Sequence, residues 1–163
     1  MTVLVAYASR HGATREIAEA IAAELSELGA EAIACDAAEV DDLRPFDEVV
    51  LGSAVYVGSW LEPARKLVEL HGDQLSSRRT WIFSSGPIGE PPKPDAAKAV
   101  QVDAIVERVR PEEHRLFAGK IDKSKLGFGE RAVMHAVRAA EGDFRDWDEI
   151  RRWAAEIASA LRA

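Results

Sequence analysis

Short apolar runs alternate with stretches of helical periodicity along the chain. Residues 3–8 form an unbroken apolar run, which is typical of a strand buried on both faces of a sheet. After a polar turn, apolar residues recur with the spacing of a helix and are followed by Gly29, a residue favoured just beyond helix C-termini. The recurring residues are Ile17, Ala18, Ile21, Ala22, Leu25 and Leu28. The pattern predicts a strand, a tight turn and a helix.

The same unit is then repeated. Residues 31–35 predict a weaker strand, and residues 48–53 predict a buried strand that ends in small residues. A helical stripe follows, with Pro63 in the first turn, where proline is tolerated, and Gly72 near the predicted end. The stripe consists of Leu61, Ala64, Leu67 and Val68.

The middle of the chain contains two more predicted strands. Residues 80–84 predict the fourth strand. The glycine- and proline-rich residues 86–94 predict a loop, because proline removes a hydrogen bond that a helix or a central strand needs. Helical periodicity resumes near Asp95 and fades before Pro111, and residues 114–119 predict the fifth strand.

Two further helices are predicted towards the C-terminus. One covers residues 128–140, and the other begins at Asp146, with Glu149 three residues later as in a capping box. The apolar stripe of the last helix is Trp147, Ile150, Trp153, Ile157 and Leu161. Strands that alternate with helices imply a parallel sheet covered on both faces. We therefore predict one α/β domain over residues 1–163, with a doubly wound, five-stranded parallel sheet.

The composition is that of a soluble globular protein. The chain has 163 residues, of which 47% are apolar, and a formal net charge of −7. The acidic balance and the scattered basic residues argue against binding to nucleic acid. Cys35 is the single cysteine, which excludes an internal disulfide and supplies a zinc site poorly. No apolar run approaches the roughly 20 residues of a membrane span, so we expect a cytoplasmic protein and leave its oligomeric state open.

The segment after the first predicted strand is a candidate anion site. In an open parallel sheet, ligands bind beyond the carboxyl ends of the strands, and a helix N-terminus there favours an anion. The segment is Ser9, Arg10, His11, Gly12, Ala13 and Thr14. Its hydroxyls, glycine and arginine suit one phosphate, and the spacings of triphosphate and dinucleotide loops are absent. The alternative is that Ser9 and Thr14 only cap the helix and that Arg10 is solvated.

The segments after the third and fourth predicted strands could flank a planar ring. The first comprises Ala54, Val55, Tyr56, Val57 and Gly58, and the second comprises Ser85, Gly86, Pro87, Ile88 and Gly89. Tyr56 follows the end of the strand pattern, so we expect its ring to face a flat ligand, whereas Trp60 is expected to join the core. The second segment can bring backbone groups to the edge of a heterocycle. Together with the phosphate segment, these loops predict a mononucleotide with a large planar base.

With these three segments, the chain resembles flavodoxin-like FMN proteins along essentially its whole length. The phosphate loop corresponds to residues 9–14, and the flavin-flanking loops correspond to residues 52–58 and 85–89. The phrases at residues 53–58 and 142–147 are similar to those of single-domain flavodoxins related to menaquinone-dependent protoporphyrinogen dehydrogenases. The resemblance implies the strand order 2-1-3-4-5, with FMN at the switch between strands 1 and 3.

The resemblance also implies a redox function. It implies an FMN-dependent oxidoreductase that passes electrons or hydride between FMN and a quinone-like or porphyrin-like partner. A one-electron carrier that serves a redox partner protein is the alternative. Electron-carrying flavodoxins have an aromatic and acidic residues in the third loop, where this chain has Gly86, Pro87 and Ile88. Fewer carboxylates repel the reduced flavin less, so this departure favours two-electron chemistry.

The other candidate residues indicate no catalytic side chain. His71, His114 and His135 have no carboxylate or cysteine at ligand spacing, and we expect them to be structural or surface residues. Ser53 or Ser84 with a histidine could imitate part of a hydrolase, but the chain lacks the Gly-x-Ser-x-Gly turn of such enzymes. The sequence therefore assigns the chemistry to the cofactor.

Overall fold

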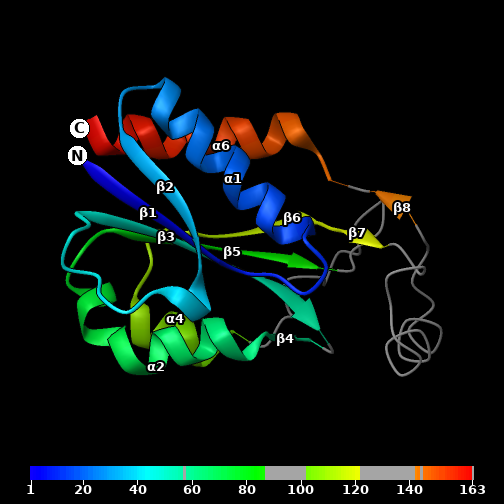
Figure 1. The fold of residues 1–163 in the computed structure, drawn as a ribbon, viewed down its shortest axis with the longest axis horizontal. Coiled ribbons are helices and arrows are strands. Elements are labelled where there is room, and N and C mark those ends of the chain that lie inside the picture. The colour runs from blue at the N-terminus through cyan, green and yellow to red at the C-terminus, as the bar shows by residue number, and fades with distance from the viewer. Residues whose placement is uncertain (57, 87–101, 122–141, 144, 163) are drawn as a thin grey trace.

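A parallel sheet forms the centre of the fold (Figure 1). The computed structural model describes residues 1–56, 58–86, 102–121, 142–143 and 145–162. The parallel strands are β1 (Thr2–Ala8), β2 (Glu31–Asp36), β3 (Glu48–Tyr56), β5 (Thr80–Gly86) and β6 (His114–Ala118). Their order is β2-β1-β3-β5-β6. Because these are the five predicted strands in the predicted order 2-1-3-4-5, the doubly wound α/β fold is confirmed.

Helices cover both faces of the sheet, as Figure 1 shows. One face carries α1 (Ala13–Glu27) and α6 (Trp147–Arg162), and the other carries α2 (Glu62–Ser76), α4 (Asp103–Val109) and the 3-10 turn η1 (Ala37–Glu39). Successive residues of β1 face opposite layers, with Val3 and Val5 towards α1 and Leu4 and Ala6 towards α2. This double burial explains the unbroken apolar run. In the part of the chain that is described, no helix is long and apolar enough to cross a membrane.

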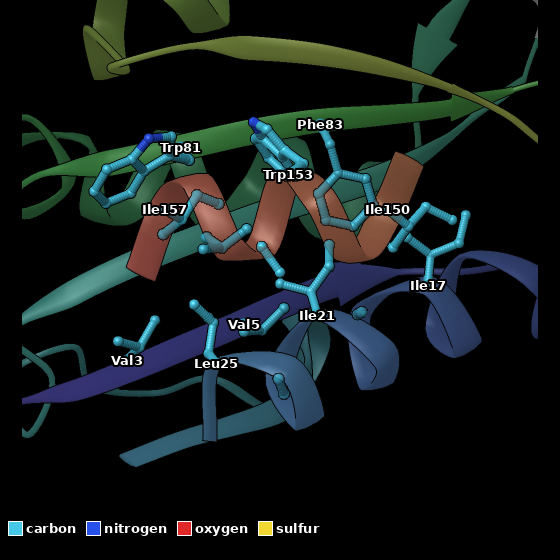
Figure 2. Packing of buried hydrophobic residues seen from close by; sticks show 14 of the residues in the cluster. Val3, Val5, Ile17, Ile21, Leu25, Trp81, Phe83, Ile150, Trp153 and Ile157 are labelled. Carbon is cyan, nitrogen blue, oxygen red and sulfur yellow. The ribbon is translucent and has the colours of Figure 1, made fainter. Parts of the chain in front are cut away.

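An aromatic cluster fills the layer between the sheet and α6 (Figure 2). Phe83 of β5, Phe117 of β6 and Trp153 of α6 are at most 1% exposed. Their ring centroids are 5.5 to 6.0 Å apart, in the tilted and edge-to-face arrangements that aromatic rings prefer. Burial of each ring contributes roughly 2–3 kcal/mol. Ile150 and Ile157 of α6 lie in the same layer, which confirms the predicted stripe of the last helix.

The helix ends follow the predicted signals at two places and depart from them at a third. The Glu149 N–H donates to Asp146 Oδ1 at 3.1 Å at the start of α6, and Pro63 lies in the first turn of α2. The predicted end near Gly72 coincides with a kink at His71, whose backbone is not helical, and a further turn of α2 continues to Ser76. The fully buried Leu75 anchors this additional turn in the core.

Two strands are longer than the sequence pattern predicts. β3 includes Ala54, Val55 and Tyr56, and β5 includes Ser85 and Gly86, all predicted as loop residues. A short strand, β4 (Ser59–Trp60), turns back on β3 and pairs Val55 with Trp60 and Tyr56 with Ser59. The backbone hydrogen bonds of this hairpin hold the end of β3 extended. Such backbone pairing cannot be predicted from the pattern of apolar residues along the sequence.

The segments after β5 were predicted less completely than the sheet. A second short pair, β7 (Lys120–Ile121) with β8 (Gly142–Asp143), is antiparallel and was not predicted. α4 lies within the segment predicted as a helix between Asp95 and Pro111 and begins at Asp103 after the N-cap Val102, and residues 95–101 of that segment lie outside the described residues. The predicted helix over residues 128–140 and residues 87–94 of the predicted loop lie outside the described residues.

The two ends of the chain flank the turn between α1 and β2. The Met1 carbonyl accepts a hydrogen bond from the Glu31 N–H at 3.0 Å. Arg162 Nη1 donates to the Leu28 carbonyl at 3.1 Å. Both ends therefore lie at the edge of the sheet where the parallel strands begin (Figure 1).

We predict that Gly52→Ala destabilises the protein by about 2–3 kcal/mol through overpacking. Gly52 pairs with Phe83 across β3 and β5, and a Cβ on Gly52 would lie 2.0 Å from Phe83 Cζ. Because Phe117 and Trp153 enclose the Phe83 ring, the ring has no space into which to move. Urea unfolding followed by tryptophan fluorescence measures the change.

Gly72→Ala is the matched control. A Cβ on Gly72 would lie 2.5 Å from Arg108 Cζ, but this flexible side chain is 43% exposed and can turn away. We expect this variant to remain within about 1 kcal/mol of the wild-type stability, because alanine also favours the helix. Equal free energies of unfolding for the two variants would contradict the packing argument.

Candidate functional site

The ends of β1, β3 and β5 lie side by side at one edge of the sheet. Ala8 of β1 pairs with Ser53 of β3, and Ser53 pairs with Ser84 of β5. All three strands are parallel, so the segments that follow them leave the sheet at the same edge (Figure 1). This is the edge at which open parallel sheets bind their ligands.

The loop after β1 leads directly into α1 and has the geometry of an anion-binding turn. Gly12 precedes the helix in a left-handed conformation, with φ of 92°, and a Cβ at this position would meet no atom within 4 Å. Its N–H donates to Ser9 Oγ at 3.0 Å. Among the described residues, no side chain caps α1 at Gly12. The first N–H groups of α1 and its dipole therefore favour a negatively charged ligand here.

The helix-capping alternative is not supported for Ser9 and Thr14. Ser9 closes the turn through the Gly12 N–H, and Thr14 lies inside α1, where its side chain is 2% exposed. His11 is exposed, and Ala13 is half-buried as the first residue of the helix. Contacts of these residues with a phosphate remain predictions.

Arg10 connects the first loop to the end of β3. Its guanidinium carbon lies 4.5 Å from the centroid of the Tyr56 ring, a distance typical of a cation–π contact. Arg10 therefore has a contact within the protein, whereas the alternative interpretation held that it is only solvated. Tyr56 is half-buried at the last position of β3. The contact brings together the predicted phosphate loop and the predicted ring-binding tyrosine.

The ends of β3 and β5 approach each other through Gly86. A Cβ on Gly86 would lie 2.9 Å from Val55 Cβ, and one on Gly119 would lie 2.8 Å from the Gly86 carbonyl oxygen. Glycine is thus required where the two predicted ring-flanking segments meet. Next to Val55, Ala54 is half-buried, and Ser85 is 3% exposed.

The remaining predicted site residues divide into two groups. Gly58 has φ of 78° and lies in the turn between β3 and β4, as its predicted backbone role requires. Val57, Pro87, Ile88 and Gly89 lie outside the described residues.

Two buried serines at this edge of the sheet form hydrogen bonds to the segment after Tyr56. Ser84 Oγ accepts a hydrogen bond from Trp60 Nε1 at 2.7 Å and lies 2.8 Å from His114 Nε2. Ser53 Oγ accepts from the Leu61 N–H at 3.0 Å. Both bonds fasten the segment after Tyr56 to the sheet. The sequence marked these serines only as possible hydrolase parts, because the pairing with Trp60 and Leu61 depends on the hairpin.

The pair of Ser84 and His114 does not form a hydrolytic site. Ser84 is 0% exposed, so a substrate could not reach its oxygen. This oxygen accepts from Trp60 Nε1, and the tautomer of the neutral imidazole decides whether it donates to or accepts from His114 Nε2. Burial lowers the pKa of His114 below its ordinary value of 6.5, which favours that neutral form. His114 is therefore a structural residue, as the sequence predicted.

Arg145 lies beside the first loop and was not predicted as a site residue. Its Nη1 lies 3.4 Å from the carbonyl oxygen of Ala13, the first residue of α1. The signal for it was the phrase at residues 142–147, which in the sequence indicated only a resemblance to a family. An arginine distant in sequence cannot be assigned to a loop from spacing alone.

Comparison with known proteins agrees with the fold. A family model described as Flavodoxin domain matches residues 4–148. The chain is 23% identical to protoporphyrinogen IX dehydrogenase [quinone] of Escherichia coli strain K12, over 97% of this chain and 95% of that protein. A solved flavodoxin from the domain Archaea has a TM-score of 0.67 at 16% identity and covers 100% of both chains. A flavodoxin of Streptococcus pneumoniae TIGR4 has a TM-score of 0.66 at 16% identity, covering 98% and 99% of the two chains.

We predict that the contribution of His114 to stability is lost as the pH falls below about 6.5, the value for an unperturbed histidine. The folded protein has the lower pKa, so the unfolded chain binds the proton more readily and acidification favours unfolding. In His114→Gln, which stays neutral, the free energy of unfolding should fall less between pH 7 and pH 5 than in the wild type. Urea unfolding at both pH values measures this difference, and identical decreases would contradict the assignment.

Proposed function

This chain belongs to the Flavodoxin domain family, and from that membership we propose that it is a redox protein that binds FMN. The proposed site is the edge at which β1, β3 and β5 end. The contact between Arg10 and Tyr56 carries the proposal, because it joins a loop suited to phosphate to an aromatic ring suited to a flavin. The family match supports a flavin, and FMN is the flavin with a single terminal phosphate.

The first loop would hold the phosphate of FMN. The Ser9 hydroxyl, the Arg10 guanidinium and the first N–H groups of α1 provide the donors that a phosphate requires. The left-handed backbone at Gly12 and the open space above it fit a bulky anion. These features favour FMN over riboflavin, which has no phosphate.

The ends of β3 and β5 would hold the ring system. Tyr56 and Val55 offer an aromatic and an apolar surface, and Gly86 brings backbone groups close to them. The proposed contributions of Val57, Gly58 and residues 87–89 follow from the sequence and the resemblance. The arrangement fits the general form of a cofactor site, in which apolar surfaces enclose the ring and a few polar groups orient it.

The proposed partner is a flat, conjugated molecule. FMN, when bound, would supply hydride and electron transfer, while the residues of this chain would bind and orient it. The Escherichia coli relative is named for protoporphyrinogen IX and quinone. We therefore propose an oxidoreductase that acts on a quinone-like or porphyrin-like molecule.

A one-electron carrier is the second candidate. The net charge of −7 favours it, because an acidic protein is steered electrostatically towards a basic partner surface. Similar solved structures are flavodoxins, although at their low identity they support the fold alone.

The visible spectrum and a reductive titration test these functions. We expect purified protein to be yellow, or to become yellow with added FMN, and mass spectrometry of the released compound to identify FMN. Dithionite reduction in a single two-electron phase, followed by reoxidation with menadione, would support the oxidoreductase. Two separate one-electron phases would support the carrier. A protein that neither contains nor takes up a flavin would exclude both.

We predict that Thr14→Val weakens FMN binding about threefold to tenfold by removing one hydroxyl donor from the phosphate. Valine has nearly the shape of threonine, so the fold should be retained although Thr14 is 2% exposed. Quenching of flavin fluorescence measures both dissociation constants, and the affinity for riboflavin should not change.

Tyr56→Leu is the contrasting variant. Loss of the aromatic ring should weaken FMN and riboflavin by similar factors, because both flavins have the same ring system. If Thr14→Val leaves FMN affinity unchanged, the phosphate does not bind at Thr14. If it weakens both flavins equally, Thr14 acts through the fold.

A further inference from the structure

Arg145 is a buried arginine in the connection between β8 and α6. Its side chain is 5% exposed. Two of its nitrogens contact the Asp143 carboxylate, Nη2 to Oδ2 at 2.8 Å and Nε to Oδ1 at 2.9 Å. Its guanidinium carbon lies 4.6 Å from the centroid of the Trp147 ring. An arginine held by a carboxylate fork and an aromatic face has a fixed position.

Arg145 also contacts the first turn of α1. Its Nη1 lies 3.4 Å from the Ala13 carbonyl oxygen and 3.2 Å from Glu16 Oε1. Hydrogen bonding to Asp143 raises the already high pKa of Arg145, so the group remains a cation. A fixed positive charge therefore lies against the helix end that follows Gly12.

Glu16 is the acidic residue in the first turn of α1. A carboxylate at a helix N-terminus interacts favourably with the helix dipole. The same position places it near the loop proposed for a phosphate dianion, and two negative groups at one helix end repel each other. The ion pair with Arg145, at 3.2 Å, offsets the charge of Glu16.

We propose that Arg145 is a positioning residue that makes the start of α1 selective for a phosphorylated flavin. It does so by pairing with Glu16, without itself contacting the phosphate. This inference rests on the proposed function, because it concerns the same site.

The net charge of the cluster formed by Arg145, Glu16 and Asp143 predicts whether each variant strengthens or weakens FMN binding. Arg145, Glu16 and Asp143 together carry one net negative charge. Arg145→Gln raises this to two negative charges, and Arg145→Gln combined with Glu16→Gln returns it to one. Glu16→Gln alone makes the cluster neutral. The affinity for a dianion should fall as the net negative charge of the cluster rises, whereas the affinity for the uncharged riboflavin should not depend on it.

The test is a comparison of FMN and riboflavin binding to the apo-protein by fluorescence quenching. At about 10 mM salt, where charges interact over ~30 Å, Arg145→Gln should reduce the preference for FMN over riboflavin about fivefold, and Glu16→Gln should increase it about twofold. The double variant should lie within about twofold of the wild type. At about 1 M salt the differences should shrink, because the screening length is then only ~3 Å.

Arg115→Gln is the matched control. Arg115 of β6 also pairs with carboxylates, but these belong to Glu113, which precedes β6, and to Glu149 and Glu156 of α6. This variant should keep the wild-type preference for FMN. Arg145→Lys, which retains the charge, should recover most of the preference lost in Arg145→Gln.

The outcomes separate this inference from the proposed function. If the wild type binds neither flavin, the proposed function fails, and the inference fails with it. If the wild type prefers FMN and Arg145→Gln keeps that preference or weakens both flavins equally, the inference is overturned while the function stands. If Arg145→Gln does not fold, as judged by circular dichroism, the Glu16→Gln variant tests the proposal instead, because Glu16 is exposed. A stronger preference for FMN in Glu16→Gln supports the proposal, and an unchanged preference overturns it.

Discussion

The candidate site depends on the parallel register that brings the carboxyl ends of β1, β3 and β5 to one edge of the sheet. Close to that edge, the pairing of β3 with β5 requires glycine at position 52, because the Phe83 ring occupies the space that a side chain there would fill. The next residues along these two strands are Ser53 and Ser84, which pair with each other. Both serines use their hydroxyls to hold the segment after Tyr56. The core and the site are thus connected through two adjacent positions in each strand.

The sequence predicted the sheet and most of the helices, because these elements depend on local patterns of apolar residues. It did not predict β4, and it ended β3 before Ala54. The hairpin that extends β3 depends on pairing between Tyr56 and Ser59, and the polar Ser59 carries no strand signal. The additional turn of α2 was missed for a related reason. The helix breaks at His71 beside the predicted end at Gly72, but the buried Leu75 favours another turn beyond the break.

For the site, local sequence predicted which residues are near the edge but not how they are supported. The first loop was predicted from its hydroxyls, its glycine and the helix that follows. The contact of Arg10 with Tyr56 joins two loops, and the contact of Arg145 with Ala13 joins residues 132 positions apart. Such contacts follow from the packing of the whole fold. Charged residues near a site are therefore harder to assign from sequence than the backbone turn that they surround.

The location of the chain ends has a practical consequence. Met1 and Arg162 both contact the turn between α1 and β2, at the pole of the molecule opposite the ends of β1, β3 and β5. A linker attached to either terminus and anchored to an electrode would present the same pole outward. Protein immobilised through either terminus would thus keep the ends of β1, β3 and β5 directed away from the surface.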